Sequence, residues 1–139
     1  MEIAQALEAA RARSEATLAT IRRSGRPQLS NVLQYTDDDG VIHISITAER
    51  AKYHNLRRDP WTALHVNGET FWSYVVIEGT AELSPVAAAP DDDTVEELVE
   101  VYRALGGEHP DWDAFRRAMI GERRVALRIR ADRAYGMLR

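Results

Sequence analysis

The segment "VIHISITA", residues 41–48, alternates apolar and small polar side chains without a break. The two sets are Ile42, Ile44 and Ile46 on one side and His43, Ser45 and Thr47 on the other. Side chains two positions apart share one face of a strand, so this period predicts a β-strand with one face for a core and one polar face. The segment "RRVALRIRA" (123–131) repeats the alternation, so at least two such faces need burial.

Turn residues separate several further strand patterns. We expect strands in "ATLATIRR", "QLSNVLQYT", "WTALHVNG", "FWSYVVIEGTAELS" and a short C-terminal "AYGML", with turns at "SGRP" and "DDDG". About six strands in antiparallel hairpins predict a mainly β fold, a closed or nearly closed β-barrel with flanking helices. The 139 residues are expected to form one domain, 1–139.

Four segments have helical patterns. Residues 2–13 place apolar side chains at helical spacing, and residues 49–60 contain a short helix that ends before Pro60. The segments "DDDTVEELVEVYRALGG" and "DWDAFRRAMIG" predict two more helices. For the first of these, Asp93 is the expected N-cap, with Glu96 reaching back as in a capping box.

Composition excludes several classes of protein. The chain has no cysteine, which excludes thiol catalysis, thiolate metal sites and disulfides. No apolar run has the roughly 18 residues that span a bilayer, and "MEIAQALEAARAR" does not resemble a secretion signal. A formal net charge of -4 argues against nucleic-acid binding. We therefore expect a cytoplasmic protein without a membrane or nucleic-acid partner.

The segment "ERAKYHNLRRDP", residues 49–60, concentrates cations in this acidic chain. Arg50 and Lys52 are expected in extended chain just before the short helix, whose first N–H groups are unpaired and favour an anion. They are therefore candidates for a phosphate site, and the alternative is a solvated helix face. Arg57 and Arg58 lie at the helix end, where cations usually face water.

No recognisable catalytic constellation accompanies these cations. The histidines are His43, His54, His65 and His109, and none shows the tight spacing of a metal site, so no metal is expected. G-x-S-x-G, P-loop and G-x-G-x-x-G motifs are absent, so the catalytic residues stay unassigned. One hairpin gathers aromatic side chains that suit either a core, an interface or a wall against a planar ring: Trp61, Phe71, Trp72 and Tyr74.

Several stretches together resemble the FMN-binding split-barrel superfamily, which includes the pyridoxamine phosphate oxidases. They are "ATLATIRRSGRPQLSNV", "AERAKYHNLRRDP", "WSYVVIEGTAELSP", "APDDDTVEELVEVYRALGGEHPDWDAFRRAM" and "RRVALRI". The R-A-K segment and the acidic helical stretch are most similar to a small subgroup that uses coenzyme F420, a deazaflavin. The resemblance implies a six-stranded antiparallel split barrel and a homodimer with two cofactor sites at its interface.

The resemblance also implies the residues that bind the cofactor. Arg50 and Lys52 correspond to the R-x-K segment that holds the cofactor phosphate, with Asn55 following. Trp72 corresponds to an aromatic residue that closes the site, expected from the partner subunit. The two strands beside the cofactor ring contribute Gln28, Ser30, Asn31 and Val32 from the first and Ser45, Ile46 and Thr47 from the second.

The choice of cofactor lies between coenzyme F420 and FMN. Both have a ribityl phosphate, but coenzyme F420 also has an anionic oligoglutamate tail that favours extra cations. Arg57 and Arg58, or a face formed by Arg124, Arg128 and Arg130, are the candidates to meet it. The chain stops at "AYGMLR", without the longer C-terminal segment of pyridoxamine phosphate oxidases, so pyridoxine phosphate chemistry is not expected.

Three functions follow from the resemblance. The leading hypothesis is an oxidoreductase that uses reduced coenzyme F420 to transfer a hydride to a conjugated organic substrate. The second is an FMN-dependent oxidase or reductase on the same fold. The third is a flavin or deazaflavin carrier without turnover, because no catalytic constellation is visible. The substrate and the proton donor are not specified by the sequence.

Overall fold

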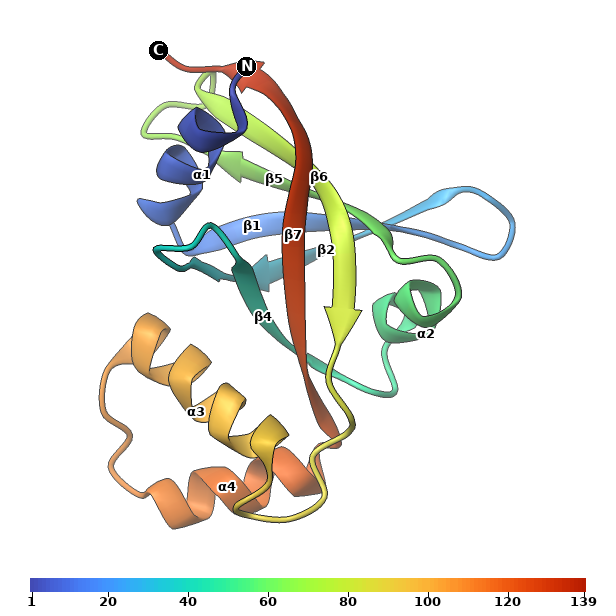
Figure 1. Cartoon of the computed structure of the whole chain (residues 1–139), viewed down its shortest axis with the longest axis vertical. Helices are drawn as coiled ribbons and strands as arrows, with labels where there is room; N and C mark the ends of the chain where they lie inside the picture. The colour runs from blue at the N-terminus through green and yellow to red at the C-terminus, as the bar shows by residue number, and fades with distance from the viewer.

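The computed structural model describes residues 1–139 as one curled antiparallel sheet with helices around it (Figure 1). The strands are β1 (Glu15–Ile21), β2 (Pro27–Leu33), β3 (Tyr35–Thr36), β4 (Ile42–Thr47), β5 (Trp61–Asn67), β6 (Tyr74–Leu83) and β7 (Arg124–Met137). The helices are α1 (Ile3–Arg11), α2 (Ala51–Arg58), α3 (Asp93–Gly106) and α4 (Trp112–Gly121). None of the four has the length and apolar composition that crossing a membrane requires.

The sheet is a split barrel, and the split lies between β2 and β4. Its strand order is β2-β1-β5-β6-β7-β4-β3, so β2 and β3 are the two edges. The curl brings β2 close to β4, yet no ladder joins them. The expected mainly β architecture with flanking helices is confirmed, and the seam between β2 and β4 is the one open side of the barrel.

The sheet has seven strands, so the expected number of six is wrong by one. The segment "QLSNVLQYT" divides at Gln34, which is fully buried. Its side-chain amide donates to the carbonyl oxygens of Ala10 and Arg13, at 3.0 and 2.8 Å, and its carbonyl oxygen accepts from Thr36. Because these bonds pull Gln34 out of the β2 line, the next two residues form β3 and pair with β4 instead.

The C-terminal part forms one continuous strand, where two strands were expected. β7 pairs with the whole of β6 from Leu127 to Met137, and a bulge absorbs Asp132 between the pairs Glu78–Arg133 and Gly79–Ala131. A Cβ atom on Gly79 would collide with the carbonyl oxygen of Arg130, so the bulge needs glycine there. The bulge shifts the alternation of inward and outward side chains by one residue while the ladder continues. The sequence pattern on the two sides of the bulge therefore resembled two separate strands.

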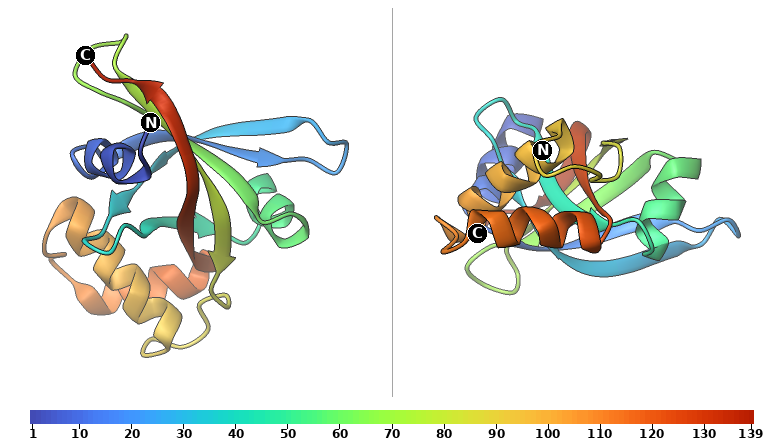
Figure 2. Two further views of the ribbon diagram at one scale, coloured as in Figure 1. Left: turned by 45° about the horizontal axis from the view of Figure 1, so that its top comes forward. Right: turned by 90° about the horizontal axis from the view of Figure 1, so that it is seen from below.

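Two hydrophobic clusters hold the elements together. The larger one, the barrel core, contains the three isoleucines of β4 and is closed at one end by Ala6 and Ala10 of α1. The smaller one packs α3 and α4 on each other and on Ala126 of β7. The two helices therefore stand against one end of the sheet, on the side away from α2, as two further views show (Figure 2). In this position, α3 and α4 form one wall of the cavity that is described below.

The start of α3 lies where the sequence predicts, but the expected cap is wrong. Asp92, not Asp93, is the N-cap residue, and its Oδ1 accepts from the N–H of Val95 at 2.8 Å. Its Oδ2 also accepts from the N–H groups of Ala88 and Ala89. Burial acts to raise the pKa of Asp92, but these three bonds outweigh it and leave the pKa below its ordinary value.

The side chain of Glu96 does not return to the helix start. It forms an ion pair with Arg116 of α4, at 2.5 Å, and so links the two helices. The expected capping box is therefore wrong in both of its members. Three consecutive aspartates at 91–93 made the position of the cap ambiguous in the sequence, and the turn at 88–89 decides it.

Asp92→Ala is expected to lower the free energy of unfolding by about 1–2 kcal/mol at pH 7, because it removes a cap. Asp93→Ala, the matched control, is expected to change it by less than about 0.5 kcal/mol. A carboxyl with a lowered folded-state pKa stabilises the fold above its unfolded pKa and loses this effect as pH falls through the folded pKa. The gap between wild type and Asp92→Ala should therefore narrow below about pH 4, in urea titrations at several pH values. Equal effects of the two variants would contradict the assignment.

Candidate functional site

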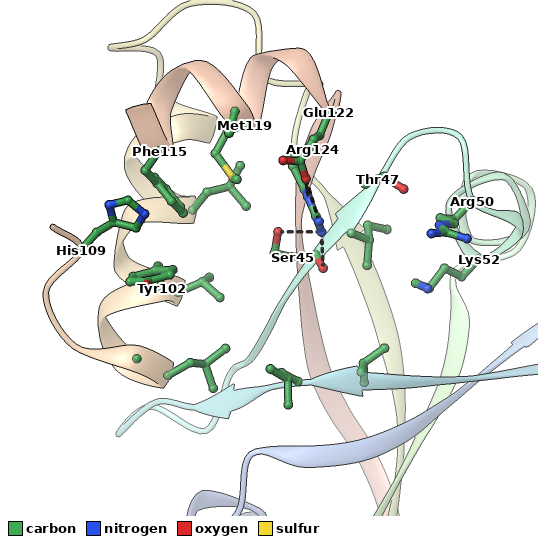
Figure 3. Close-up of a pocket in the computed structure, with 18 of the residues that line it drawn as sticks. Ser45, Thr47, Arg50, Lys52, Tyr102, His109, Phe115, Met119, Glu122 and Arg124 are labelled. Carbon is green, nitrogen blue, oxygen red and sulfur yellow. Dashed lines mark hydrogen bonds and ion pairs between the residues drawn. The ribbon is translucent and has the colours of Figure 1, made fainter. Parts of the chain in front are cut away.

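A cavity of about 1070 Å³ opens at the seam between β2 and β4 and extends under α3 and α4. This volume lies at the upper end of the range of about 300–1,000 Å³ for ordinary ligand pockets. Figure 3 shows its two ends, with Arg50 and Lys52 beside the start of α2 at one end and Tyr102, His109 and Phe115 at the other. The cavity is therefore cationic at one end and aromatic at the other.

The cationic end lies at the N-terminus of α2. Arg50 is the N-cap residue with extended backbone, as expected, and both Arg50 and Lys52 line the cavity. Lys52 is the second helical residue, so its expected place before the helix is wrong. The N–H groups of Ala51 and Lys52 have no acceptor within the chain. Burial lowers the pKa of Lys52, and the charges of Arg50 and Arg124 lower it further. An anion bound here would relieve this repulsion and accept from the free N–H groups.

The middle of the cavity is polar. Ser45 and Thr47 line it from β4, and one guanidinium nitrogen of Arg124 lies 3.5 Å from both the hydroxyl and the carbonyl oxygen of Ser45. Two other nitrogens of the same guanidinium, Nε and Nη2, donate to one carboxylate oxygen of Glu122, at 3.0 and 2.9 Å. Across the seam, Ser30 lines the cavity and its Oγ is buried without a hydrogen-bond partner. A buried hydroxyl without a partner is costly, so the middle fits a ligand with polar groups.

The other end is formed by α3, α4 and the loop between them. Tyr102, His109 and Phe115 form a ring cluster with centroids 5.1–5.5 Å apart. Together with aliphatic side chains of both helices they make this end apolar. We call this part, formed by the lining residues between Leu98 and Met119, the helical pocket.

The structure brings together eight of the eleven residues that the resemblance assigns to the cofactor. Ile46 borders the cavity although its side chain lies in the barrel core, with 1% of its surface exposed. The eight are Ser30, Asn31, Val32, Ser45, Ile46, Thr47, Arg50 and Lys52.

The other three do not line this cavity. Asn55 is buried and donates to the hydroxyl of Thr20 at 3.1 Å, so it fastens α2 to β1. Gln28 bonds the same hydroxyl from β2. Trp72 is 66% exposed and belongs to the β5–β6 loop, which Figure 1 shows at the end of the molecule opposite α3 and α4. Within one chain, Trp72 is therefore remote from the cavity.

The cations that are candidates to bind an anionic tail do not lie together in the structure. Arg128 forms a two-point ion pair with Glu97, at 2.6 and 2.7 Å, and Arg130 pairs with Glu82. Only Arg124 of that face lines the cavity. Arg58 donates to the carbonyl oxygen of Ile21 in β1, so the end of α2 is tied to the β1–β2 hairpin.

Cations without a carboxylate partner gather in one region. Of the 18 lysines and arginines, eight form ion pairs. Seven of the other ten form what we call the cation strip: Arg22, Arg23, Arg26, Arg50, Lys52, Arg57 and Arg58. Figures 1 and 2 show the β1–β2 turn projecting on the same side of the molecule as α2, and Arg58 of α2 bonds Ile21 at the base of this hairpin. The strip therefore runs from the cationic end of the cavity along α2 to the hairpin.

The histidines lie on separate elements and form no metal-ligating group. His43 binds Asp37 at 2.7 Å, and His65 stacks on Tyr74. No three His, Asp or Glu side chains lie close enough to hold a metal ion. His109 is the one histidine that lines the cavity. In the sequence, His109 is a candidate only as a metal ligand, and the apolar side chains of the helical pocket are fully accounted for by the helical periodicity that predicts α3 and α4.

The fold is an antiparallel split barrel, and the cavity at its seam is cationic at one end. The chain belongs to the pyridoxamine 5'-phosphate oxidase family, whose model of the N-terminal domain matches residues 2–138. The resemblance inferred from the sequence is therefore confirmed at the level of the family.

Solved structures show the same fold. A conserved hypothetical protein of Mycobacterium tuberculosis is 28% identical, with a TM-score of 0.72 over 96% of this chain and 82% of that one. An F420 reductase is 22% identical, with a TM-score of 0.70 over 92% of this chain and 94% of that one. A haem storage protein of Vibrio cholerae is 14% identical, with a TM-score of 0.68 over 98% and 95%. Proteins with different ligands in their names thus share this architecture.

Proposed function

We propose that the chain is an oxidoreductase that binds coenzyme F420 in the cavity and reduces a conjugated organic substrate. The observation that carries the proposal is the cationic end of the cavity. There Arg50, Lys52 and two free N–H groups of α2 face the same space, as a phosphate needs. The structural similarity to an F420 reductase agrees with this choice.

The residues present fit the rest of such a ligand. Ser45 and Thr47 offer hydroxyl groups along β4, at the level of a ribityl chain and a polar ring edge. The buried Oγ of Ser30 lacks a partner and lies on the opposite strand. A planar polar heterocycle between β2 and β4 would supply that partner. The seam thus offers hydrogen-bonding groups from both sides.

The cation strip favours coenzyme F420 over FMN. A ribityl phosphate needs only Arg50 and Lys52, whereas five further unpaired arginines continue from them to the β1–β2 turn. Asp59 is the one acid among residues 21–36 and 50–60, and its carboxylate accepts from the N–H of Trp61. An oligoglutamate tail attached to the phosphate end would lie along these charges.

The chemistry divides between the cofactor and the chain. When bound, the reduced deazaflavin supplies a hydride to a carbon of the acceptor. The chain binds the phosphate, orients the ring along β4 and excludes water with the helical pocket. No side chain is assigned as a proton donor, in agreement with the absence of a recognisable acid–base constellation in the sequence.

Lys52→Ala is expected to weaken binding of coenzyme F420 about tenfold or more, because it removes one charged partner of the phosphate. Calorimetric titration of the apoprotein measures this. Arg117→Ala is the control, since it also removes one cation, but one that is exposed and does not line the cavity. Its affinity should equal that of wild type.

Parallel titrations with FMN and haem decide between the ligands. Tight FMN binding without saturable binding of coenzyme F420 would instead favour the FMN-dependent oxidase or reductase. Haem is included because a haem storage protein shares the fold. Binding of coenzyme F420 without hydride transfer to any of a broad panel of enones and quinones would leave a carrier function.

Replacing the three hairpin arginines by serine (Arg22→Ser, Arg23→Ser, Arg26→Ser) tests the cation strip. These side chains are exposed and lie away from the phosphate end, so FMN affinity should stay unchanged. Affinity for coenzyme F420 with a long tail should fall by about two- to tenfold, as expected for several exposed charge pairs. Equal losses for both cofactors would rule out a role for the hairpin in binding the tail.

We also propose a homodimer that completes the site. Leu29 and Leu33 on the edge strand β2 are 64% and 54% exposed, and Phe71 and Trp72 are exposed in the β5–β6 loop. Apolar surface of this kind marks an interface. In such a dimer, Trp72 of the partner subunit could reach the seam.

Light scattering at micromolar concentration should give twice the chain mass, and Leu29→Glu with Leu33→Glu should give a monomer. A monomeric wild type would be incompatible with the dimer.

A further inference from the structure

The helical pocket lies outside the part of the cavity that matches the phosphate, ribityl chain and ring edge of the cofactor. The phosphate, the ribityl chain and the ring edge are matched by the cationic end and by the polar side chains at the seam. Ten further lining residues, all between Leu98 and Met119, come from α3, α4 and their loop. These ten residues lie apart from the groups that match the cofactor, at the other end of the cavity.

We propose that the helical pocket binds the acceptor, an uncharged planar ring with a carbonyl oxygen, and that His109 donates a hydrogen bond to that oxygen. The assignment of this ligand as the substrate rests on the proposed function. The binding of this ligand is independent of the proposed function, because it depends on residues that are separate from the phosphate end.

The walls of the helical pocket select a planar apolar ligand. Tyr102 and Phe115 contribute rings, and Met119 contributes a polarizable side chain that adapts to ring edges. No carboxylate or cation lines this part of the cavity, since the nearest charged lining residues are Glu122 and Arg124 at the polar middle. An uncharged ring is therefore favoured over a charged ligand, which would lose its hydration without a partner.

A second layer of side chains holds these walls from behind. The ring of Trp112 packs on those of His109 and Phe115, at 5.7 and 5.4 Å, but does not line the cavity. Its indole N–H donates to Glu108 at 2.9 Å, and the guanidinium of Arg103 lies over its ring at 4.9 Å. Such fixed support preorganises a binding wall.

The backbone fixes the tautomer of His109. The N–H of Asp111 donates to Nδ1 of His109 at 2.9 Å, so Nδ1 is the acceptor of the ring. In a neutral imidazole the remaining proton must then be on Nε2. The carboxylate of the same Asp111 caps α4 by accepting from the N–H of Ala114 at 3.0 Å, which keeps Asp111 in place.

This geometry leaves Nε2–H of the neutral His109 ring as its hydrogen-bond donor. A doubly protonated ring would lose the bond from Asp111, because Nδ1 would then have to donate. The neutral ring offers Nε2–H, which stabilises negative charge on a carbonyl oxygen without giving up its proton. The oxygen of a quinone or an enone gains such charge when the ring accepts a hydride.

Fluorescence of Trp112 tests binding in the helical pocket directly. The variant Trp61→Phe with Trp72→Phe leaves Trp112 as the only tryptophan. The probe is 2-methyl-1,4-naphthoquinone, a planar quinone that quenches indole at short range. Saturable quenching of Trp112 is expected without any cofactor. Free N-acetyltryptophanamide is the control, and it should show only non-saturable quenching.

His109→Phe tests the hydrogen bond while it keeps an aromatic ring in place. It should weaken binding of the quinone about two- to tenfold, the usual effect of one hydrogen bond. Binding of 2-methylnaphthalene, which has no carbonyl oxygen, should be unchanged. His54→Phe is the matched control, because His54 does not line the cavity, and it should bind both probes as wild type does. Circular dichroism verifies that each variant is folded.

Each alternative result overturns part of the proposal. Absence of saturable quenching rejects the binding site, and equal losses for quinone and hydrocarbon in His109→Phe reject the hydrogen bond. Calorimetric displacement of the quinone by saturating coenzyme F420 or FMN would show that the cofactor itself occupies the helical pocket. Lys52→Ala should keep quinone binding while cofactor binding falls, so failure of the cofactor proposal and failure of this one are distinguishable.

Discussion

The alternation in β4 is the constraint on which both the fold and the site depend. Its three isoleucines are almost fully buried in the barrel core, and burial of such side chains stabilises a fold by about 1.5–3 kcal/mol each. The intervening Ser45 and Thr47 must then face the opposite side, which is the cavity. A shift of the strand by one residue would bury the hydroxyl groups and expose the isoleucines, so the register of the core also fixes the register of the site.

The helices α3 and α4 depend on the sheet in a second way. Glu97 of α3 binds Arg128 of β7 through two hydrogen bonds, and Arg128 lies directly across the ladder from His43 of β4. On α4, Phe115 and Met119 pack with Ala126 of β7 in the smaller cluster. The helical pocket thus has a defined position relative to β4, although no strand runs through it.

The sequence predicted what depends on periodicity and local chemistry. The alternating strands, the four helices, a mainly β barrel and the two cations near the start of α2 follow from patterns within about ten residues, and all of these elements are present. The split in the barrel was implied by the family resemblance and not by these patterns. The division of β2 and β3 was missed because it depends on bonds between Gln34 and α1, which are distant in sequence. The cap of α3 was displaced by one residue because three aspartates are locally equivalent.

Local sequence patterns also could not predict the parts of the site that depend on long-range packing. Asn55 follows the R-x-K segment, but its amide turns toward Thr20 of β1 instead of the cavity. His109 lies in a loop between two helices, and only the packing of α3 on α4 brings it beside Phe115. Tertiary contacts of this kind decide which of several polar side chains faces a ligand.

The cation strip has a counterpart at the other side of the molecule. Residues 91–122, which include α3 and α4, hold ten acidic residues against three basic ones. Figures 1 and 2 show these helices on the side of the sheet away from α2. The chain therefore has a large electric dipole although its net charge is only -4. Such a dipole turns an approaching anion toward the α2 side before contact, and the resulting gain in association rate decreases as ions screen the field.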